Sequence, residues 1–371
     1  MKTVLKNGLV FTEDGIFREL EVEFDNGVIT CLGEGCQGQE VDCSGCYVLP
    51  GLTDVHFHGC NGADLCDGDT ASLSAMAQYE FSRGITSICP ATMTLPEDRL
   101  RTVISCAAEY SQAGHINSAC LLGLHLEGPF ISVKNHGAQS AEDISLPHVK
   151  KLRYWQELSG GLIKLVTIAP EVQGALECIS QCSEEFHFSV GHTNATYDEC
   201  IKAFELGADH VTHLFNAMPA FHHRETRVIG AALDNRECFV ELISDGIHCS
   251  PTAVRAAFTL FGDDRIVLIS DSTEATGMPD GEYTLGGEPI IKRSGAAFLK
   301  NGGLAGSTSD LYDCFIRAVS FGIPLESAIK AATINPCRSI GAHDLWGSIR
   351  LGKAAHFLIL RKEDLSIFKV I

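Results

Sequence analysis

Seven ionisable side chains that could bind a metal ion or transfer a proton each follow a short apolar run. They are His56, His58, Glu127, His192, His213, His248 and Asp271. Apolar runs of this length are typical of buried strands, so these residues are expected at strand ends. Histidine nitrogens and carboxylate oxygens are ligands of zinc and of related divalent ions, which activate water for hydrolysis. The pattern predicts a site for a divalent metal ion, with zinc as the first choice and iron, manganese or cobalt as alternatives.

His56 and His58 are separated by one residue, so a regular strand places both rings on the same face. Both rings could then approach one ion. Two buried rings without a partner would be costly, and so would a buried Glu127 carboxylate without a cation or a donor. The spacing therefore favours a metal site over a purely structural role.

Eight apolar runs between residues 49 and 340 must position these side chains. They are YVLPGLTDVHFHG, GITSICPAT, CLLGLHLEGPF, LIKLVTIAPE, FHFSVGHTN, DHVTHLFNAM, CFVELISDGIHC and RIVLISDST. Segments with helical periodicity separate them, such as residues 100–107 and the segment after the capping-box pair Thr196 and Glu199. Eight alternating units fit an α/β fold of the (β/α)8 TIM-barrel type better than an open doubly wound sheet. The carboxyl ends of the strands in such a barrel surround one shared cavity.

Residues 1–48 and 341–371 have a different pattern of short alternating segments with Asn-Gly and Gly turns. We expect them to form a small β-sandwich subdomain from both chain ends, with the barrel spanning residues 49–340. Most of the 16 cysteines are expected to be reduced, buried thiols. A structural zinc site formed by Cys31, Cys36, Cys43 and Cys46 is the alternative for this group.

Composition excludes several classes of protein. The 371 residues carry a formal net charge of −19 without a basic block, which argues against a nucleic-acid partner. No apolar stretch reaches the roughly 18 residues of a membrane-spanning helix. The amino terminus lacks the apolar core of a secretory signal, so a cytoplasmic location is expected.

The motifs HFHG, HLEGPF, VGHTNA, THLFNAM, DGIHC and SDSTEATG occur in this order, and together they resemble the N-acetylglucosamine-6-phosphate deacetylase family of the amidohydrolase superfamily. The resemblance spans nearly the whole chain. It implies that Glu127, His192 and His213 hold the main metal and that Asp271 is the catalytic acid and base. It also implies that His56 and His58 serve a second metal position bridged by Glu127, so one or two ions are expected per subunit.

The resemblance further implies a phosphosugar substrate and the release of acetate from N-acetylglucosamine 6-phosphate. Positions that match substrate contacts are Ala138, Gln139, Asn216, Ala217, Arg224, His248, Leu304, Ala305, Gly306 and Ser307. Many relatives have histidine where this chain has Gln139, so only a neutral hydrogen bond to the acetyl carbonyl is expected there. Arg224 is thought to reach the neighbouring subunit's site in the family, which implies a homodimer. Its segment FHHRETR is either a phosphate anchor or a solvated loop.

Three alternatives stay open. N-acetylgalactosamine 6-phosphate differs from the first substrate in one hydroxyl orientation that no motif identifies. Cyclic-amide and nucleobase hydrolases of the superfamily commonly bridge their metals with a carboxylated lysine, whereas this chain has Glu127 at the corresponding strand end. Non-catalytic members typically lose ligands or the terminal aspartate, and this chain retains them.

Overall fold

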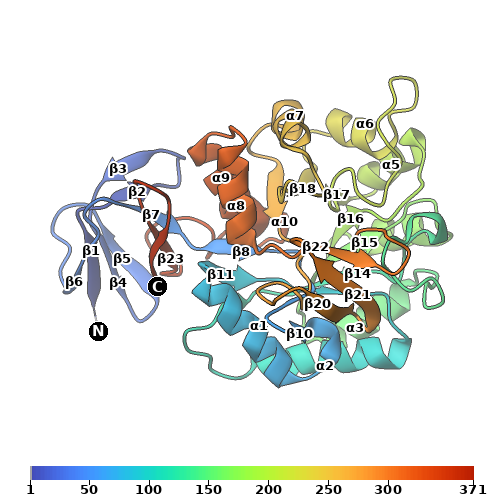
Figure 1. Ribbon diagram of the computed structural model, residues 1–371, viewed down its shortest axis with the longest axis horizontal. Helices are drawn as coiled ribbons and strands as arrows, with labels where there is room; N and C mark the ends of the chain where they lie inside the picture. Colours follow the sequence, from blue (N-terminus) through green and yellow to red (C-terminus); the bar gives the residue numbers. More distant parts are fainter. Residues whose placement is uncertain (1) are drawn as a thin grey trace.

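A barrel of eight parallel strands forms the larger part of the computed structural model, which describes residues 2–371 (Figure 1). The strands are β8 (Leu52–Asp54), β11 (Ile85–Ile88), β14 (Leu124–Glu127), β15 (Ile163–Ile168), β16 (His187–Val190), β17 (Ala208–Val211), β18 (Phe239–Ile243) and β19 (Ile266–Ile269). Strands β14 to β19 pair in sequence order, and β8 pairs with β11. Each strand falls within a predicted apolar run, except that β17 begins one residue before its run.

Short strands and backbone hydrogen bonds complete the ring of pairings. Strand β13 (Cys120–Leu121) pairs with β11, and β12 (Ala91–Thr92) pairs with β14. Past the ends of β8 and β19, the Asp271 N–H donates to the His56 carbonyl at 2.9 Å, and the His58 N–H donates to the Ser272 carbonyl at 2.8 Å. These bonds join the first strand to the eighth, so the predicted barrel is confirmed.

Helices alternate with the strands and cover the outside of the barrel (Figure 1). They are α1 (Thr70–Ser82), α2 (Glu97–Ser111), α3 (Val149–Leu158), α4 (Ala175–Cys182), α5 (Tyr197–Glu205), α6 (Arg227–Asp234), α7 (Pro251–Phe261), α8 (Leu311–Ser320), α9 (Leu325–Ala332) and α10 (Ile334–Ser339), with the 3-10 turns Leu65–Asp67 and Val133–Asn135. The capping box of Thr196 and Glu199 is present, and α2 covers the predicted segment 100–107. None of these helices has the length and apolar character required to cross a bilayer.

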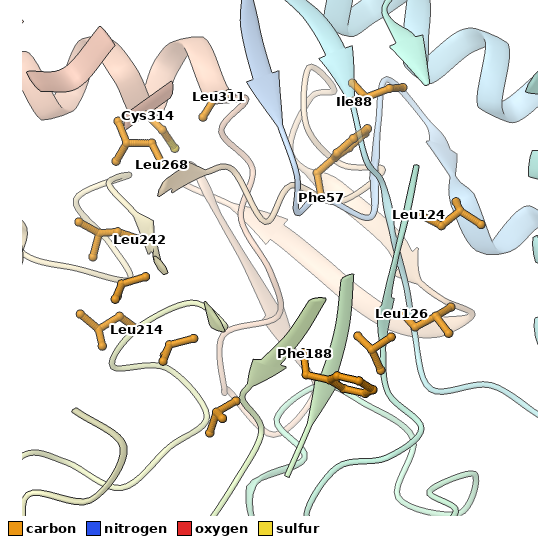
Figure 2. Packing of buried hydrophobic residues seen from close by; sticks show 14 of the residues in the cluster. Phe57, Ile88, Leu124, Leu126, Phe188, Leu214, Leu242, Leu268, Leu311 and Cys314 are labelled. Atoms are coloured by element: carbon orange, nitrogen blue, oxygen red, sulfur yellow. The ribbon is translucent and has the colours of Figure 1, made fainter. Parts of the chain in front are cut away.

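Strand alternation in β14 separates an apolar outer face from a polar inner face. Leu124 and Leu126 of β14 are fully buried in the main hydrophobic cluster, together with Leu242 of β18 (Figure 2). Because side chains alternate along a strand, His125 and Glu127 lie on the opposite face, inside the barrel. Burial of the outer face against the helices supplies the main driving force for folding, and the inner face carries the chemistry.

Both chain ends form two further sheets beside the barrel, at the left of Figure 1. One has the order β5 (Val28–Leu32), β4 (Val22–Asp25), β1 (Thr3–Lys6), β6 (Gln39–Asp42), and the other has the order β24 (Ile367–Val370), β23 (Phe357–Arg361), β7 (Cys46–Pro50), β2 (Leu9–Phe11), β3 (Phe17–Glu19). Their facing side chains form a separate apolar cluster that includes Val22, Val48 and Phe357. The sandwich is confirmed, whereas the boundaries at residues 48 and 341 stay a prediction.

Two small sheets were not predicted. The hairpin of β9 (Gly59–Cys60) and β10 (Ala63–Asp64) follows β8, and an antiparallel sheet of β20 (Gly281–Leu285), β21 (Glu288–Arg293) and β22 (Ala296–Leu299) lies between β19 and α8. At the β20–β21 turn, Gly286 has a φ of +59°, and a Cβ there would lie 2.6 Å from the Met93 Cγ. The turn therefore requires glycine to approach the barrel rim so closely.

The four cysteines of the amino-terminal segment do not gather. Among residues 2–371, the metal-competent group in this region contains Cys31, Cys36 and Glu23 but neither Cys43 nor Cys46. The latter two are buried in the apolar cluster of the sandwich. The four-cysteine zinc alternative is therefore wrong, because the strands carry the two pairs to different places.

The capping box of α5 allows a direct test of local stability. Thr196→Ala removes the side-chain oxygen that accepts the Glu199 N–H. The free energy of unfolding, measured by denaturant titration, should fall by about 1 kcal/mol. The control is Thr102→Ala on the exposed face of α2, where the hydroxyl donates only to the Asp98 carbonyl. Equal losses in the two variants would contradict the role of the cap.

Candidate metal centre and active site

The carboxyl ends of the strands surround a cavity of about 210 Å³. Its lining consists of His58, Met93, Glu127, Gly137, Ala138, Gln139, His192, His213, Asn216, Ala217, His248, Asp271, Leu285, Leu304 and Gly306. Six of the seven chemically competent residues predicted at strand ends line it. The seventh, His56, is fully buried directly beneath.

Glu127 lies at the centre of the histidines. Its Oε1 is 3.1 Å from the His192 Nε2, 3.0 Å from the His213 Nε2 and 3.2 Å from the His56 Nε2. Its Oε2 is 3.3 Å from the His58 Nε2. The carboxylate therefore belongs to two groups of three donors, one with His56 and His58 and one with His192 and His213, and within each group the donor atoms lie within 4.8 Å of one another.

The outer nitrogens of three rings have acceptors that orient them. The Nδ1 atoms of His58 and His192 lie 3.1 and 3.0 Å from the carbonyls of Ala91 and Asn135, and the His56 Nδ1 lies 2.8 Å from the Glu241 Oε2. Since these oxygens accept, each Nδ1 carries a proton, so Nε2 is the nitrogen that would offer its lone pair to a bound cation. The buried His56 Nε2 has no hydrogen-bond partner within the described chain. This donor set fits a divalent cation.

Backbone conformation at the strand ends directs three of these side chains. His192, His213 and Asp271 have φ values of 45°, 27° and 49°, in the left-handed region that residues other than glycine seldom adopt. The chain therefore turns sharply where each strand meets the cavity. Such local strain is tolerated where surrounding structure holds it in place, which is common at functional sites.

Electrostatics keeps the two cavity carboxylates ionised. Burial alone would raise the pKa of Glu127, but His56 and His192 outweigh it and hold this pKa well below its usual range. Burial likewise raises the pKa of Asp271. The hydrogen bond from His58 and the charge of His56 outweigh burial, so the net pKa is lowered. Asp271 Oδ1 is 3.2 Å from the His58 Nε2 and faces the cavity beside the cluster. It is thus placed to accept a proton from a molecule bound there.

Most of the predicted substrate positions line the cavity. Ala138, Gln139, Asn216, Ala217, His248, Leu304 and Gly306 do so. Ala305 instead packs in the hydrophobic cluster, and the Ser307 hydroxyl donates to the Ser270 carbonyl at 2.6 Å. Backbone alternation in this loop turns both side chains inward, so they brace the loop rather than line the cavity.

Arg224 lies outside the cavity of its own chain. It is exposed on the loop before α6, where its Nη1 is 2.7 Å from the His223 Nε2. With Glu225 and Arg227 it lines a separate surface depression beside Tyr197 and other residues of α5 and α6. Within one chain, the structure does not bring Arg224 together with Asp271.

Gln139 differs from the sequence-based expectation. Its Nε2 donates to the Glu127 Oε2 at 2.6 Å, and its Oε1 accepts the Thr94 N–H at 2.5 Å. The amide nitrogen of Gln139 thus holds the Glu127 carboxylate, and its oxygen is bonded to the backbone. A hydrogen bond to a substrate carbonyl would have to use its second N–H proton.

Sequence reasoning did not identify three residues of the lining, Met93, Gly137 and Leu285. Apolar side chains carry no chemical signal, and Leu285 reaches the cavity only because the β20–β21 turn folds back against Met93. Gly137 has a φ of +60°, and a Cβ there would lie 3.2 Å from the His192 Cε1. A glycine beside His136 in the stretch NHGAQ is the one local hint of this close approach.

Comparison with known proteins agrees with this geometry. The model of the Amidohydrolase family matches residues 47–371. An N-acetylglucosamine-6-phosphate deacetylase of Vibrio furnissii is 35% identical over 93% of this chain and 87% of its own. An N-acetylgalactosamine-6-phosphate deacetylase of Escherichia coli O157:H7 is 32% identical over 97% of this chain and 95% of its own.

A solved structure extends the comparison to three dimensions. It is a variant of the N-acetyl-D-glucosamine-6-phosphate deacetylase of Mycobacterium smegmatis in complex with N-acetyl-D-glucosamine-6-phosphate, with a TM-score of 0.91, 30% identity and coverage of 100% of this chain and 97% of that one. The fold and the site define an amidohydrolase, an enzyme that hydrolyses amide bonds. Within that class, the chain belongs to the N-acetylglucosamine-6-phosphate deacetylase family.

The pair His56 and His58 beside the shared Glu127 predicts two metal-binding steps. Titration of metal into apoprotein should show a second, weaker equivalent, and the double variant His56→Ala/His58→Ala should lose it. Metal content is measured by elemental analysis after dialysis. Unchanged metal content and rate in the double variant, with full activity at one equivalent, would make the pair structural.

Proposed function

We propose that this enzyme removes the acetyl group of N-acetylglucosamine 6-phosphate, giving glucosamine 6-phosphate and acetate. The observation that carries the proposal is Asp271, a carboxylate on the cavity wall 3.2 Å from a histidine of the metal-competent cluster. The family of the relatives supplies the substrate class. Release of acetate from this substrate by purified protein, measured with a coupled assay, is the direct test, and no release would overturn it.

The residues that would hold the metal are Glu127, His192 and His213, with His56 and His58 at a second position. A bound divalent ion, for which zinc is our first choice, would polarise the amide carbonyl and lower the pKa of water. The negative charge of Glu127 favours the binding of a cation in the cavity. The carbonyl partners of His58 and His192 keep the proton on Nδ1 of each ring, so that Nε2 would be the atom that binds the metal.

Asp271 performs the proton transfers in this proposal. As an ionised carboxylate it accepts a proton from the attacking water, and the resulting acid delivers that proton to the departing nitrogen. Without this delivery the nitrogen would leave as a strongly basic anion. One side chain can serve both steps because it faces the cavity beside the cluster, with its Oδ1 3.2 Å from the His58 Nε2.

His248 supports recognition of the phosphorylated sugar. Burial lowers its pKa, but a hydrogen bond of 2.7 Å to Asp245 outweighs burial, and the net pKa is raised. The ring, which lines the cavity, is thereby biased toward the charged form that binds anions. Because Arg224 lies outside this cavity, we propose a homodimer in which it completes the partner's site. A phosphorylated substrate is charged and does not cross membranes freely, which favours a cytoplasmic enzyme.

The galactosamine epimer is the second candidate substrate. The Escherichia coli relative carries that name at an identity close to that of the first, so overall similarity does not separate the two. Parallel kcat/KM measurements on both 6-phosphates decide between them. A cyclic-amide hydrolase with a carboxylated lysine is disfavoured, since no lysine is among the described residues that line the cavity.

Asp271→Asn tests the proton-transfer role. The variant keeps the shape of the side chain but removes its basicity, so kcat should fall by about 10²–10⁴ while fold and bound metal are nearly intact. Steady-state kinetics and elemental analysis on the same sample make the measurement. Activity within a few-fold of wild type would contradict the role, and loss of metal would identify Asp271 as a ligand.

Arg224→Ala tests the phosphate contact. It should weaken transition-state binding of the 6-phosphorylated substrate by about 1.5–3 kcal/mol, as for a charge-assisted hydrogen bond, and leave N-acetylglucosamine nearly unaffected. Mixed dimers with an Asp271→Asn partner should regain activity if the arginine acts across the interface. Equal losses of kcat/KM on both substrates would show that Arg224 supports its loop instead.

A further inference from the structure

Beneath the metal-competent cluster, Glu241 contacts a histidine from each of the two ligand groups. Its Oε2 lies 2.8 Å from the His56 Nδ1 and accepts the backbone N–H of His213 at 3.0 Å. Its Oε1 lies 3.3 Å from the His210 Nε2. The side chain is fully buried on β18, and it does not line the cavity. It therefore cannot touch a substrate, but it can set the positions of His56 and His213.

The two contacts act on different degrees of freedom. The hydrogen bond to Nδ1 fixes the tautomer and the ring orientation of His56, so that Nε2 faces Glu127. The backbone hydrogen bond holds the peptide of His213, whose φ of 27° is outside the regions that residues ordinarily adopt. His58 and His192, in contrast, are oriented by neutral backbone carbonyls. Glu241 is thus the charged outer partner that the two ligand groups share.

We propose that Glu241 is a positioning residue that couples the two metal positions, which rests on the proposed metal-dependent function. Its removal weakens both positions, first by releasing the His56 ring and second by releasing the backbone that presents His213. A residue that only filled the barrel core would leave metal affinity unchanged once the protein had folded. Metal affinity in the absence of substrate is therefore the informative measurement.

The experiment compares Glu241→Gln with wild type by competition for zinc against a chromophoric chelator, with thermal unfolding of the apoprotein as a folding control. The dissociation constant should rise by about 10–100-fold, the usual effect of losing an outer partner of a metal-bound histidine. The matched control is Thr212→Val, which removes a buried hydroxyl bonded to Thr167 and Ser189 in the same barrel core. Its zinc affinity should equal that of wild type.

A double-mutant cycle separates positioning from general damage. In the background of His56→Ala, the additional loss caused by Glu241→Gln should shrink to the part transmitted through His213. Fully additive losses, or an affinity within twofold of wild type in the single variant, would overturn the proposal. If Glu241→Gln does not fold, Glu241→Asp, which keeps the charge but shortens its reach, is measured in the same way. Because no substrate is present, failure here is distinct from failure of the deacetylase assay.

Cys31 and Cys36 carry a second, independent inference. Their sulfurs are 2.7 Å apart, with Cys31 partly exposed on β5 and Cys36 buried. Two thiolates on a tetrahedral zinc with bonds of 2.3 Å would lie about 3.8 Å apart. The third member of the group, Glu23, already accepts hydrogen bonds from Lys2, Thr30 and the Gln37 N–H. The pair therefore fits mutual thiol chemistry better than a metal.

We infer that Cys31 and Cys36 form a dithiol that is oxidised by low-molecular-weight disulfides. The Cys31 thiolate attacks one sulfur of the disulfide RSSR and releases one thiolate RS⁻, leaving a mixed disulfide. The Cys36 sulfur, deprotonated as it attacks, then displaces the second RS⁻ from Cys31. Two protein thiols are oxidised and RSSR is reduced to two RSH, which take up the two protons. Burial and the neighbouring thiol raise the pKa of Cys36 to about 12, which agrees with Cys31 attacking first.

Incubation of the protein with oxidised glutathione, followed by alkylation and peptide mass mapping, tests this inference. A peptide linkage between Cys31 and Cys36 that lacks two hydrogen atoms is expected, with Cys43 and Cys46 still alkylated as the buried matched pair. Cys31→Ser should leave Cys36 alkylated. Full alkylation of both cysteines, a glutathione adduct that persists on Cys31, or zinc binding lost with Cys31→Ser would overturn it.

Discussion

The structure of the active site depends on neutralising one buried negative charge. The Glu127 carboxylate is only 2% exposed, and a buried charge without partners would be prohibitively costly. Four histidine nitrogens lie within 3.3 Å of its oxygens, and Gln139 donates a hydrogen bond of 2.6 Å. The same arrangement that compensates the charge places the four Nε2 atoms where they would bind a cation. Stability of the site and its capacity to bind metal thus have a common origin.

Inside the barrel, an apolar layer and a polar layer of side chains lie beneath that charge. Val55, Leu165 and Val267 belong to an apolar cluster at one level, which requires no hydrogen bonds. Above it, hydroxyls and rings form a polar layer, in which the His125 Nε2 lies 2.7 Å from the Thr167 Oγ1. Burial lowers the pKa of His125 to about 3, so this ring is neutral and adds no charge beneath the cluster. Glu241 connects this layer to the ligands above.

Several features followed from local sequence alone. Eight apolar runs separated by helical segments indicated eight strands, and the capping pair marked the start of α5. The separation of His56 and His58 by one residue placed both rings on one face. Because parallel strands of a barrel end at the same rim, the identities of Glu127, His192 and Asp271 were enough to predict that they converge. These inferences needed only periodicity and the chemistry of each side chain.

Tertiary structure alone decided which groups pair across the chain. Glu241 meets His56 across 185 residues, and Gln139 turns toward Glu127 instead of being free for a substrate. The β20–β21 turn brings Leu285 to the cavity, whereas Arg224 remains outside it. Such pairings are set by the register of strands and the packing of loops, which depend on the whole fold. Local sequence specifies what a side chain can do, and the assembled barrel determines what it can reach.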